Sequence, residues 1–183
     1  MIREIYPHTV PKKERQTMRR HVLSLVVENT SGVVSHISGL FSRRAFNMDS
    51  FTAGITSDPR FTRVTIAVNA DERELDQIKK QLAKLEDVIA IKELYPESSV
   101  CRELMLVKIK VDESRRGQLI TATEIFRGKI TDVANDSLIV ELTGDQRKLD
   151  AFMELLSSYE ILEIARTGIT GLTRGTKYLK IYE

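Results

Sequence analysis

Residues 29–47 of this 183-residue chain read N-T-S-G-V-V-S-H-I-S-G-L-F-S-R-R-A-F-N, and they decide the fold because they join a strand to a helix. Residues 21–28, directly before them, form an apolar run typical of a β-strand. From Val33 onward, apolar residues recur at the three- and four-residue spacing of a helix. The sequence therefore predicts a strand, a tight polar turn and a helix that begins at Gly32.

The start of this predicted helix is suited to bind a carboxylate. Gly32 has no Cβ to keep a ligand from the backbone, and the first N–H groups of a helix lack partners within it. Asn29 before the helix and Asn47 after it supply neutral donors and acceptors for an amino-acid zwitterion.

Capping is the simpler alternative for the same residues. Asn29, Thr30 or Ser31 could cap the helix, a role worth about 1 kcal/mol. Asn47 could be the left-handed residue that ends the helix. The spacing alone leaves both interpretations open.

The elements that follow complete a β-α-β-β-α-β unit, which we assign to a domain of residues 19–96. Residues 48–56 and 61–68 form a hairpin, residues 71–85 an amphipathic helix, and residues 88–94 a strand. This order makes a four-stranded antiparallel sheet with both helices on one face, the ferredoxin-like arrangement.

The same element order repeats in a second domain, residues 97–176, after a linker at residues 95–99. Its predicted elements are a strand at 102–111, a helix at 114–127, a hairpin of 129–134 and 137–142, a helix at 145–159 and a strand at 161–167. The fold class is therefore α+β, with two tandem ferredoxin-like domains. Residues 1–18 are an N-terminal arm and residues 177–183 a C-terminal tail. Each open sheet leaves a bare face and two edges, so we expect a homodimer or higher homo-oligomer.

Composition indicates a globular protein with 42% hydrophobic and 30% charged residues. A net charge of +2 gives no reason to expect nucleic acid or a membrane as partner. The single Cys101 excludes an intramolecular disulfide and fits a reducing compartment. The first residues have no signal-peptide pattern, so the expected location is the cytoplasm.

Catalytic groups are sparse in this sequence. His8, His21 and His36 stand at no metal-binding spacing, and no nucleophile motif or phosphate loop occurs. Arg102 could lower the pKa of the neighbouring Cys101, although a lone thiol at a strand start is usually structural. The basic pairs at residues 43–44, 79–80 and 115–116 are interpreted as solvated helix faces. We therefore expect no enzymatic activity, no catalytic residue and no metal site in this chain.

RNA binding is an alternative that the ferredoxin-like fold allows. RNA-binding domains of this fold stack bases on aromatic side chains of the central strands. Here residues 23–27 and 64–68 fill those strands mainly with Leu, Val and Ile, and Phe61 is one aromatic nearby. This pattern disfavours RNA binding.

The turn and helix resemble the start of an ACT domain, specifically that of the acetolactate synthase (acetohydroxyacid synthase) small regulatory subunit. The resemblance covers residues 18–176. Beyond residues 25–50, it rests on E-L-M-L-V-K-I at 103–109, T-E-I-F-R-G at 123–128, K-L-D-A-F at 148–152 and A-R-T-G-I-T-G-L-T-R-G at 165–175.

This resemblance implies a non-catalytic subunit that activates a catalytic large subunit and confers feedback inhibition by valine or a related branched-chain amino acid. The holoenzyme is a transferase that makes acetolactate from pyruvate. Its cofactors, thiamine diphosphate, Mg²⁺ and FAD, are implied on the catalytic chain and none on this one.

The resemblance also implies where the effector binds, between two ACT domains of a dimer. The matching positions are Asn29, Gly32, Val33, Ser35 and Asn47, with Asn47 reaching the effector held by the neighbouring protomer.

On this basis we expect the N–H groups of Gly32 and Val33 to take the carboxylate, and Val33 with Ile37 to line the side-chain pocket. The family often has alanine after the glycine, whereas this chain has Val33 and Val34.

A free-standing amino-acid-sensing ACT protein is the alternative function. A sensor that acts on transcription would need a basic helix-turn-helix unit, and neither residues 1–18 nor the second repeat supplies one. The second repeat also lacks the Asn-x-x-Gly turn, having D-E-S-R-R-G at 112–117, so we do not expect it to bind the same ligand.

Overall fold

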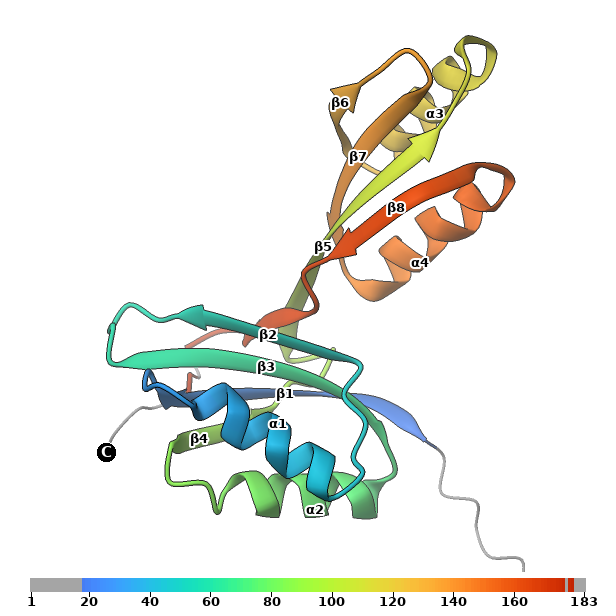
Figure 1. Cartoon of the computed structure of the whole chain (residues 1–183). Helices are drawn as coiled ribbons and strands as arrows, with labels where there is room; N and C mark the ends of the chain where they lie inside the picture. Colours follow the sequence, from blue (N-terminus) through green and yellow to red (C-terminus); the bar gives the residue numbers. More distant parts are fainter. Residues whose placement is uncertain (1–17, 177, 180–183) are drawn as a thin grey trace, which may run out of the picture.

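The computed structural model of the protein describes residues 18–176, 178 and 179. Apart from Met18, Tyr178 and Leu179, the predicted arm (residues 1–18) and tail (residues 177–183) lie outside the described residues. The described part folds into two repeats of the same element order, one standing on the other (Figure 1).

The first repeat is a four-stranded sheet covered by two helices on one face (Figure 1). Its elements are β1 (Arg19–Glu28), α1 (Val33–Arg43), β2 (Ser50–Ile55), β3 (Phe61–Ala70), α2 (Glu72–Leu82) and β4 (Val88–Glu93). The strand order is β2-β3-β1-β4, and every neighbouring pair is antiparallel. The predicted ferredoxin-like fold is confirmed here.

The second repeat has the same topology with one additional strand. Its elements are β5 (Ser99–Lys110), α3 (Glu113–Ile125), β6 (Lys129–Val133), β7 (Ser137–Gly144), α4 (Gln146–Leu155), a 3₁₀ turn (Leu156–Ser158), β8 (Glu160–Arg166) and β9 (Thr170–Thr173). The main strand order is β6-β7-β5-β8, again antiparallel, with α3 and α4 on one face.

Each repeat has its own core between its sheet and its helices. In the first, alternate residues of the central strands, such as Leu23 and Leu25 opposite Ile66 and Val64, point toward α1 and α2 and are fully buried. In the second, Met105, Val107 and Ile109 hold the same position relative to α3 and α4. The alternation of apolar residues along the strands therefore decides which face the helices cover.

Three helices end earlier than predicted. The helix predicted at residues 114–127 ends at Ile125. The helix predicted at residues 71–85 ends at Leu82, and the one predicted at 145–159 ends at Leu155 before the 3₁₀ turn. Leu85 and Leu156 nevertheless pack against the cores from the turns that follow. Apolar spacing alone could not separate a last helical turn from a buried residue just beyond it.

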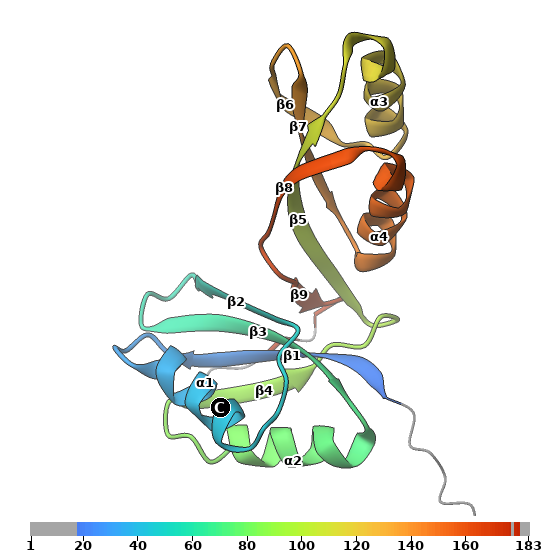
Figure 2. The same cartoon turned by 45° about the vertical axis from the view of Figure 1, so that its right-hand side comes forward.

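The sequence missed strand β9 and placed the start of β5 too late. β5 begins at Ser99, so the predicted linker at residues 95–99 is shorter, and residues 99–102 pair with β9. Figure 2 shows this two-stranded ribbon between the two sheets. β9 has only four residues, Thr-Gly-Leu-Thr, with a single large apolar side chain, and so short a segment gave no recognisable strand pattern.

The ribbon and the residues that lead into β9 cover the face of the first sheet that we expected to be bare. Ser24, Val26, Thr65 and Ala67 point away from α1 and α2, yet each is at most 1% exposed. Thr52 Oγ1 donates to the carbonyl of Thr167 at 3.0 Å from this face. The expectation of a bare face is therefore wrong for the first repeat. Of the sheet features expected to be open, its two edge strands, β2 and β4, remain.

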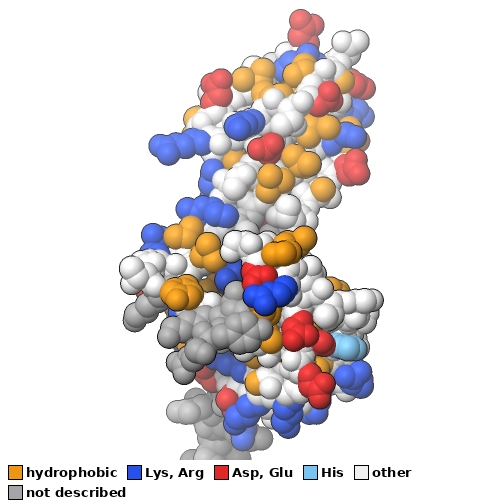
Figure 3. All heavy atoms as spheres, turned by 90° about the vertical axis from the view of Figure 1, so that its left-hand side faces the viewer, with side chains coloured by type: hydrophobic (Ala, Val, Ile, Leu, Met, Phe, Trp, Pro, Cys, Tyr) orange, Lys and Arg blue, Asp and Glu red, His pale blue; other side chains and the backbone are white. Residues whose placement is uncertain are grey.

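The corresponding face of the second sheet is open, and Figure 3 shows it with hydrophobic and charged side chains interspersed. Leu106 is 36% exposed there. Two ion pairs cross from β5 to β8, Lys108–Glu163 at 3.4 Å and Lys110–Glu160 at 3.0 Å. The two repeats thus share a topology but differ in what covers their sheets.

Candidate functional site

Helix α1 begins without a side-chain cap. Its N-cap residue, Gly32, has φ 97° and ψ −13°, a left-handed conformation that glycine adopts at little cost. No side chain accepts a hydrogen bond at this helix start. The alternative that Asn29, Thr30 or Ser31 caps the helix is therefore wrong.

Asn29 is held in place by the neighbouring hairpin. Its Nδ2 donates to the carbonyl of Pro59 at 2.9 Å, and its Oδ1 accepts from Thr62 Oγ1 at 3.0 Å. The N–H of Asn29 also donates to the carbonyl of Arg60 at 2.7 Å. Asn29 thus fixes the turn against the loop between β2 and β3. Nothing in the sequence indicated this interaction, because the partners are about 30 positions away.

Val33 and Ile37 belong to the core of the first repeat. Val33 is 6% exposed and Ile37 is fully buried, and both pack in the core under the sheet. The expectation that Ile37 lines an effector pocket is wrong in this chain, because the side chain has no accessible surface. Ser35, in the first turn of α1, is exposed.

Asn47 lies beyond the far end of α1 and is exposed. Ala45, with φ 55°, is the left-handed residue after the helix, so the alternative role of Asn47 as a left-handed helix stop is wrong. An 11-residue helix spans about 16 Å, which separates Gly32 from Asn47. The structure therefore does not bring the predicted effector residues together within one chain.

The other helices begin differently. Asp71 accepts hydrogen bonds from the N–H groups of Arg73 and Glu74, both at 2.9 Å, at the start of α2. Asp112 caps α3 through the N–H of Arg115, and Asp145 caps α4 through that of Lys148, each at 3.0 Å. Hydrogen bonds from Ser114 and from the backbone of Arg115 hold the pKa of Asp112 below its usual value. In these three helices a carboxylate of the chain itself occupies the position that is open at α1.

The basic pairs are engaged in contacts rather than simply solvated. Arg44 donates to Gln81 at 2.9 Å, and the Arg115 guanidinium stacks 4.0 Å from the Tyr159 ring centroid while donating to Ser158. Lys79 Nζ lies 2.5 Å from Glu93 Oε2. These partners are distant in sequence, so the interpretation as solvated faces was wrong for them.

Two of the histidines pair with carboxylates across the first repeat. His36 Nδ1 lies 2.6 Å from Asp87 Oδ2 on the surface. His21 Nδ1 lies 2.9 Å from Glu93 Oε1, where both side chains are 9% exposed. Burial raises the pKa of Glu93, but hydrogen bonds from Lys79, His21 and Tyr95 outweigh it and leave the pKa below its ordinary value.

Cys101 does not have the lowered pKa that its neighbour Arg102 suggested. Burial raises the pKa of the thiol and exceeds the opposing effect of the Arg102 charge. Within residues 18–176, 178 and 179, no group of three or more His, Cys, Asp and Glu side chains is placed to hold a metal ion. None of the helices in this part of the chain is long and apolar enough to cross a membrane.

Comparisons with known proteins match both repeats. A family model described as AHAS small subunit-like ACT domain matches residues 23–90, and one described as small subunit of acetolactate synthase matches residues 102–175. The probable acetolactate synthase small subunit of Methanothermobacter thermautotrophicus is 48% identical over 158 residues, covering 86% of this chain and 94% of that protein.

Two further relatives agree. The acetolactate synthase isozyme 3 small subunit of Escherichia coli is 44% identical over 162 residues, covering 88% of this chain and 99% of that protein. A crystal structure of the acetolactate synthase small subunit from Thermotoga maritima superposes with a TM-score of 0.79 at 39% identity, covering 87% of this chain and 99% of that one. The chain therefore belongs to the family of acetolactate synthase small subunits, and its first repeat is an ACT domain.

Proposed function

We propose that this chain is the regulatory subunit of an acetolactate synthase. It binds the catalytic large subunit, raises its activity and makes it sensitive to valine or a related branched-chain amino acid. The observation that carries this proposal is the 43–48% identity to small subunits of the enzyme along most of the chain. Thiamine diphosphate, Mg²⁺ and FAD act on the catalytic chain, in the cytoplasm, and this chain performs no step of the transferase reaction.

The uncapped start of α1 supports the assignment of the Gly32 and Val33 N–H groups as the donors that bind the effector carboxylate. Their N–H groups have no side-chain acceptor, whereas Asp71, Asp112 and Asp145 fill the equivalent position in the other helices. A hydrogen bond to a charged group contributes about 1.5–3 kcal/mol, and the helix dipole favours an anion at this end. Ser35 lies in the first turn and adds a hydroxyl group.

A second copy of the chain completes the site. Asn29, Gly32 and Ser35 are exposed at one end of α1 and Asn47 at the other, so only a neighbouring protomer can bring Asn47 to the same effector. Because Ile37 is buried, the aliphatic side chain of the effector packs against groups of the neighbouring protomer and the exposed Val34. The first sheet has its outer face covered, so the dimer forms through the edges and the helix layer.

Inhibition requires a modest coupling between this site and the catalytic chain. A coupling of about 1–3 kcal/mol means that bound valine changes the affinity of this subunit for the catalytic chain by roughly 5- to 150-fold. Reciprocity then requires that the catalytic chain change the affinity of this subunit for valine by the same factor.

Reconstitution tests the proposal directly. The full chain is mixed with a catalytic acetolactate synthase chain, and pyruvate consumption is followed while valine, leucine and isoleucine are titrated. We expect the mixture to be faster than the catalytic chain alone and to be inhibited by at least one of the three. Binding of an amino acid with no effect on turnover would instead favour the free-standing sensor.

A further inference from the structure

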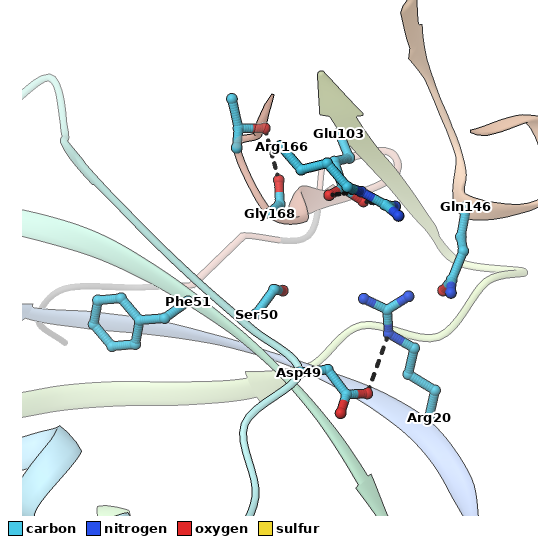
Figure 4. Close-up of a pocket in the computed structure, with 9 residues that line it drawn as sticks. Arg20, Asp49, Ser50, Phe51, Glu103, Gln146, Arg166 and Gly168 are labelled. Atoms are coloured by element: carbon cyan, nitrogen blue, oxygen red, sulfur yellow. Dashed lines mark hydrogen bonds and ion pairs between the residues drawn. The ribbon is translucent and has the colours of Figure 1, made fainter. Parts of the chain in front are cut away.

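A polar cavity of about 440 Å³ lies where the two repeats meet. Its lining comes from both repeats: Arg20 and Asp49 from the first, Glu103, Gln146 and Arg166 from the second (Figure 4). These residues are up to 146 positions apart in sequence (20 to 166), so no local motif could have indicated the cavity. None of the predicted effector residues lines it.

The two arginines of this cavity are held differently. Arg166 donates from Nε and Nη2 to the two oxygens of Glu103, both at 2.8 Å, and Glu103 is 5% exposed. Arg20 lies 3.8 Å from Asp49, beyond hydrogen-bond distance, and its Nε is buried without a hydrogen-bond partner among the described residues. A buried donor without a hydrogen-bond partner is costly, so Arg20 calls for an acceptor.

Donors from both repeats point into the same space. Figure 4 shows the guanidinium of Arg20 facing Gln146 and the guanidinium of Arg166 across the cavity. Gln146 is the first residue of α4, and its side-chain amide supplies a neutral donor to the cavity. Arg166 has five N–H donors and uses two on Glu103, which leaves donors for a ligand.

We infer that this cavity binds a small carboxylate monoanion that bridges Arg20 of the first repeat and Arg166 with Gln146 of the second. A carboxylate matches the planar fork of a guanidinium. The walls already hold two carboxylates, Asp49 and Glu103, against two arginines, so a single negative charge is accommodated better than two. This site is separate from the start of α1 and does not depend on the effector proposed there.

Binding at this place ties the two repeats together. Among the described residues, direct hydrogen bonds between the repeats include Thr52 to Thr167 at 3.0 Å and Ile169 to Ser50 at 3.4 Å, both at one side of the cavity. An anion held between β1 and β8 adds a second connection and fixes the angle between the ACT domain and the second sheet. The cavity is thus a second ligand site at the junction through which the repeats communicate.

Amide chemical shifts of the full-length ¹⁵N-labelled protein test this inference with pyruvate as the probe and sodium chloride as the ionic-strength control. We expect saturable shifts with one dissociation constant at Ser50 on one wall and at Gln146, Thr167 and Gly168 on the other. Arg20→Gln should raise that constant about tenfold or more, the equivalent of ~1.4 kcal/mol. Arg166 is left unchanged because its loss would strand the buried Glu103.

Arg19→Gln is the matched control, because it removes the same charge one position earlier from an exposed side chain. It should leave the dissociation constant within about twofold, and both variants should keep the wild-type unfolding midpoint. Shifts that fail to saturate, or that change equally in the two variants, would overturn the site and leave Arg20 solvated by water. Saturation with inorganic phosphate but not with pyruvate would overturn the carboxylate assignment.

Discussion

The two repeats of this protein have the same strand order, yet they differ at the start of their first helix. In the first repeat α1 begins at a glycine with φ 97° and no side-chain cap. In the second, α3 begins at Asp112, whose carboxylate accepts from a backbone N–H of the helix. The difference shows that the same topology can leave the first N–H groups of a helix without a side-chain acceptor or can satisfy them with a side chain of its own.

The repeats differ again in the outer face of their sheets. The first sheet is covered by the ribbon of β5 and β9, whereas the second exposes Leu106 and two cross-strand ion pairs. The two repeats therefore present different surfaces from the same topology. The first repeat carries the proposed effector site, and the second has an exposed sheet face.

The largest expected effect comes from placing a carboxylate at the open helix start. Gly32→Asp puts a like charge where the effector carboxylate binds, so the valine concentration for half-inhibition should rise at least tenfold while activation of the catalytic chain persists. Loss of one or two charge-assisted hydrogen bonds of about 1.5–3 kcal/mol accounts for this size. The measurement is valine titration of the reconstituted enzyme.

Gly32→Asn is the matched control for this substitution. Asn has the same shape as Asp without the charge, and it tolerates positive φ better than most residues. We expect it to keep most of the valine sensitivity. Equal loss in both variants would assign the effect to the backbone at φ 97° and not to charge.

The covered face of the first sheet can be disrupted through Gly171. A Cβ at this position would lie 2.6 Å from Cys101 Sγ and 3.0 Å from the carbonyl oxygen of Val100. Gly171→Val should therefore lower the free energy of unfolding by about 1–3 kcal/mol through overpacking. Gly54→Val, at an open position of the edge strand β2, should stay within about 0.5 kcal/mol in the same urea titration.

The caps of the helices give a smaller effect. Asp71→Ala removes the acceptor of two backbone N–H groups and should lower the free energy of unfolding by about 1 kcal/mol. Ser31→Ala, beside the uncapped start of α1, should change it by less than about 0.5 kcal/mol. A comparable loss in both variants would mean that Ser31 caps α1 after all.

The smallest effect is a pH dependence of the folding stability that comes from Glu93. This residue joins β4 to β1 through its ion pair with His21, and in the second repeat the ion pair of Arg166 with Glu103 joins β8 to β5 in the same way. The folded-state pKa of Glu93 lies below its usual 4.5, so the stability it contributes is present above about pH 4.5 and is lost as pH falls through the folded pKa.

Glu93→Gln should be less stable than the wild type at neutral pH, and the difference should narrow in acid. Urea unfolding at a series of pH values measures this. Glu163→Gln, on an exposed side chain paired with Lys108, is the control and should show little change with pH. An unchanged difference across the range would contradict the lowered pKa.

Much of the fold could be predicted because it follows from local patterns. Alternating apolar residues in β1 and β3 and helical spacing in α1 fix the strands, the helices and the face that each buries. The shared element order of the two repeats then selects the ferredoxin-like sheet. Strand β9 was not predicted because it is only four residues long and pairs with a strand about 70 positions earlier in the chain.

The candidate site could be predicted only in part. The sequence pointed to Gly32 as the helix start, and a resemblance to acetolactate synthase small subunits supplied the residues around it. It could not show that Ile37 is buried, that Asn29 is tied to Pro59 and Thr62, or that Asn47 lies at the opposite end of α1. Those facts depend on which distant segments meet.

The sequence by itself determined the repeated element order and the glycine that begins α1, because these depend on residues within a few positions of one another. The tertiary structure alone decided that the C-terminal ribbon covers the first sheet and that Arg20 faces Arg166 across a cavity. These contacts join segments that are far apart in the chain, and burial and electrostatics between such segments act only once the two sheets have been placed together.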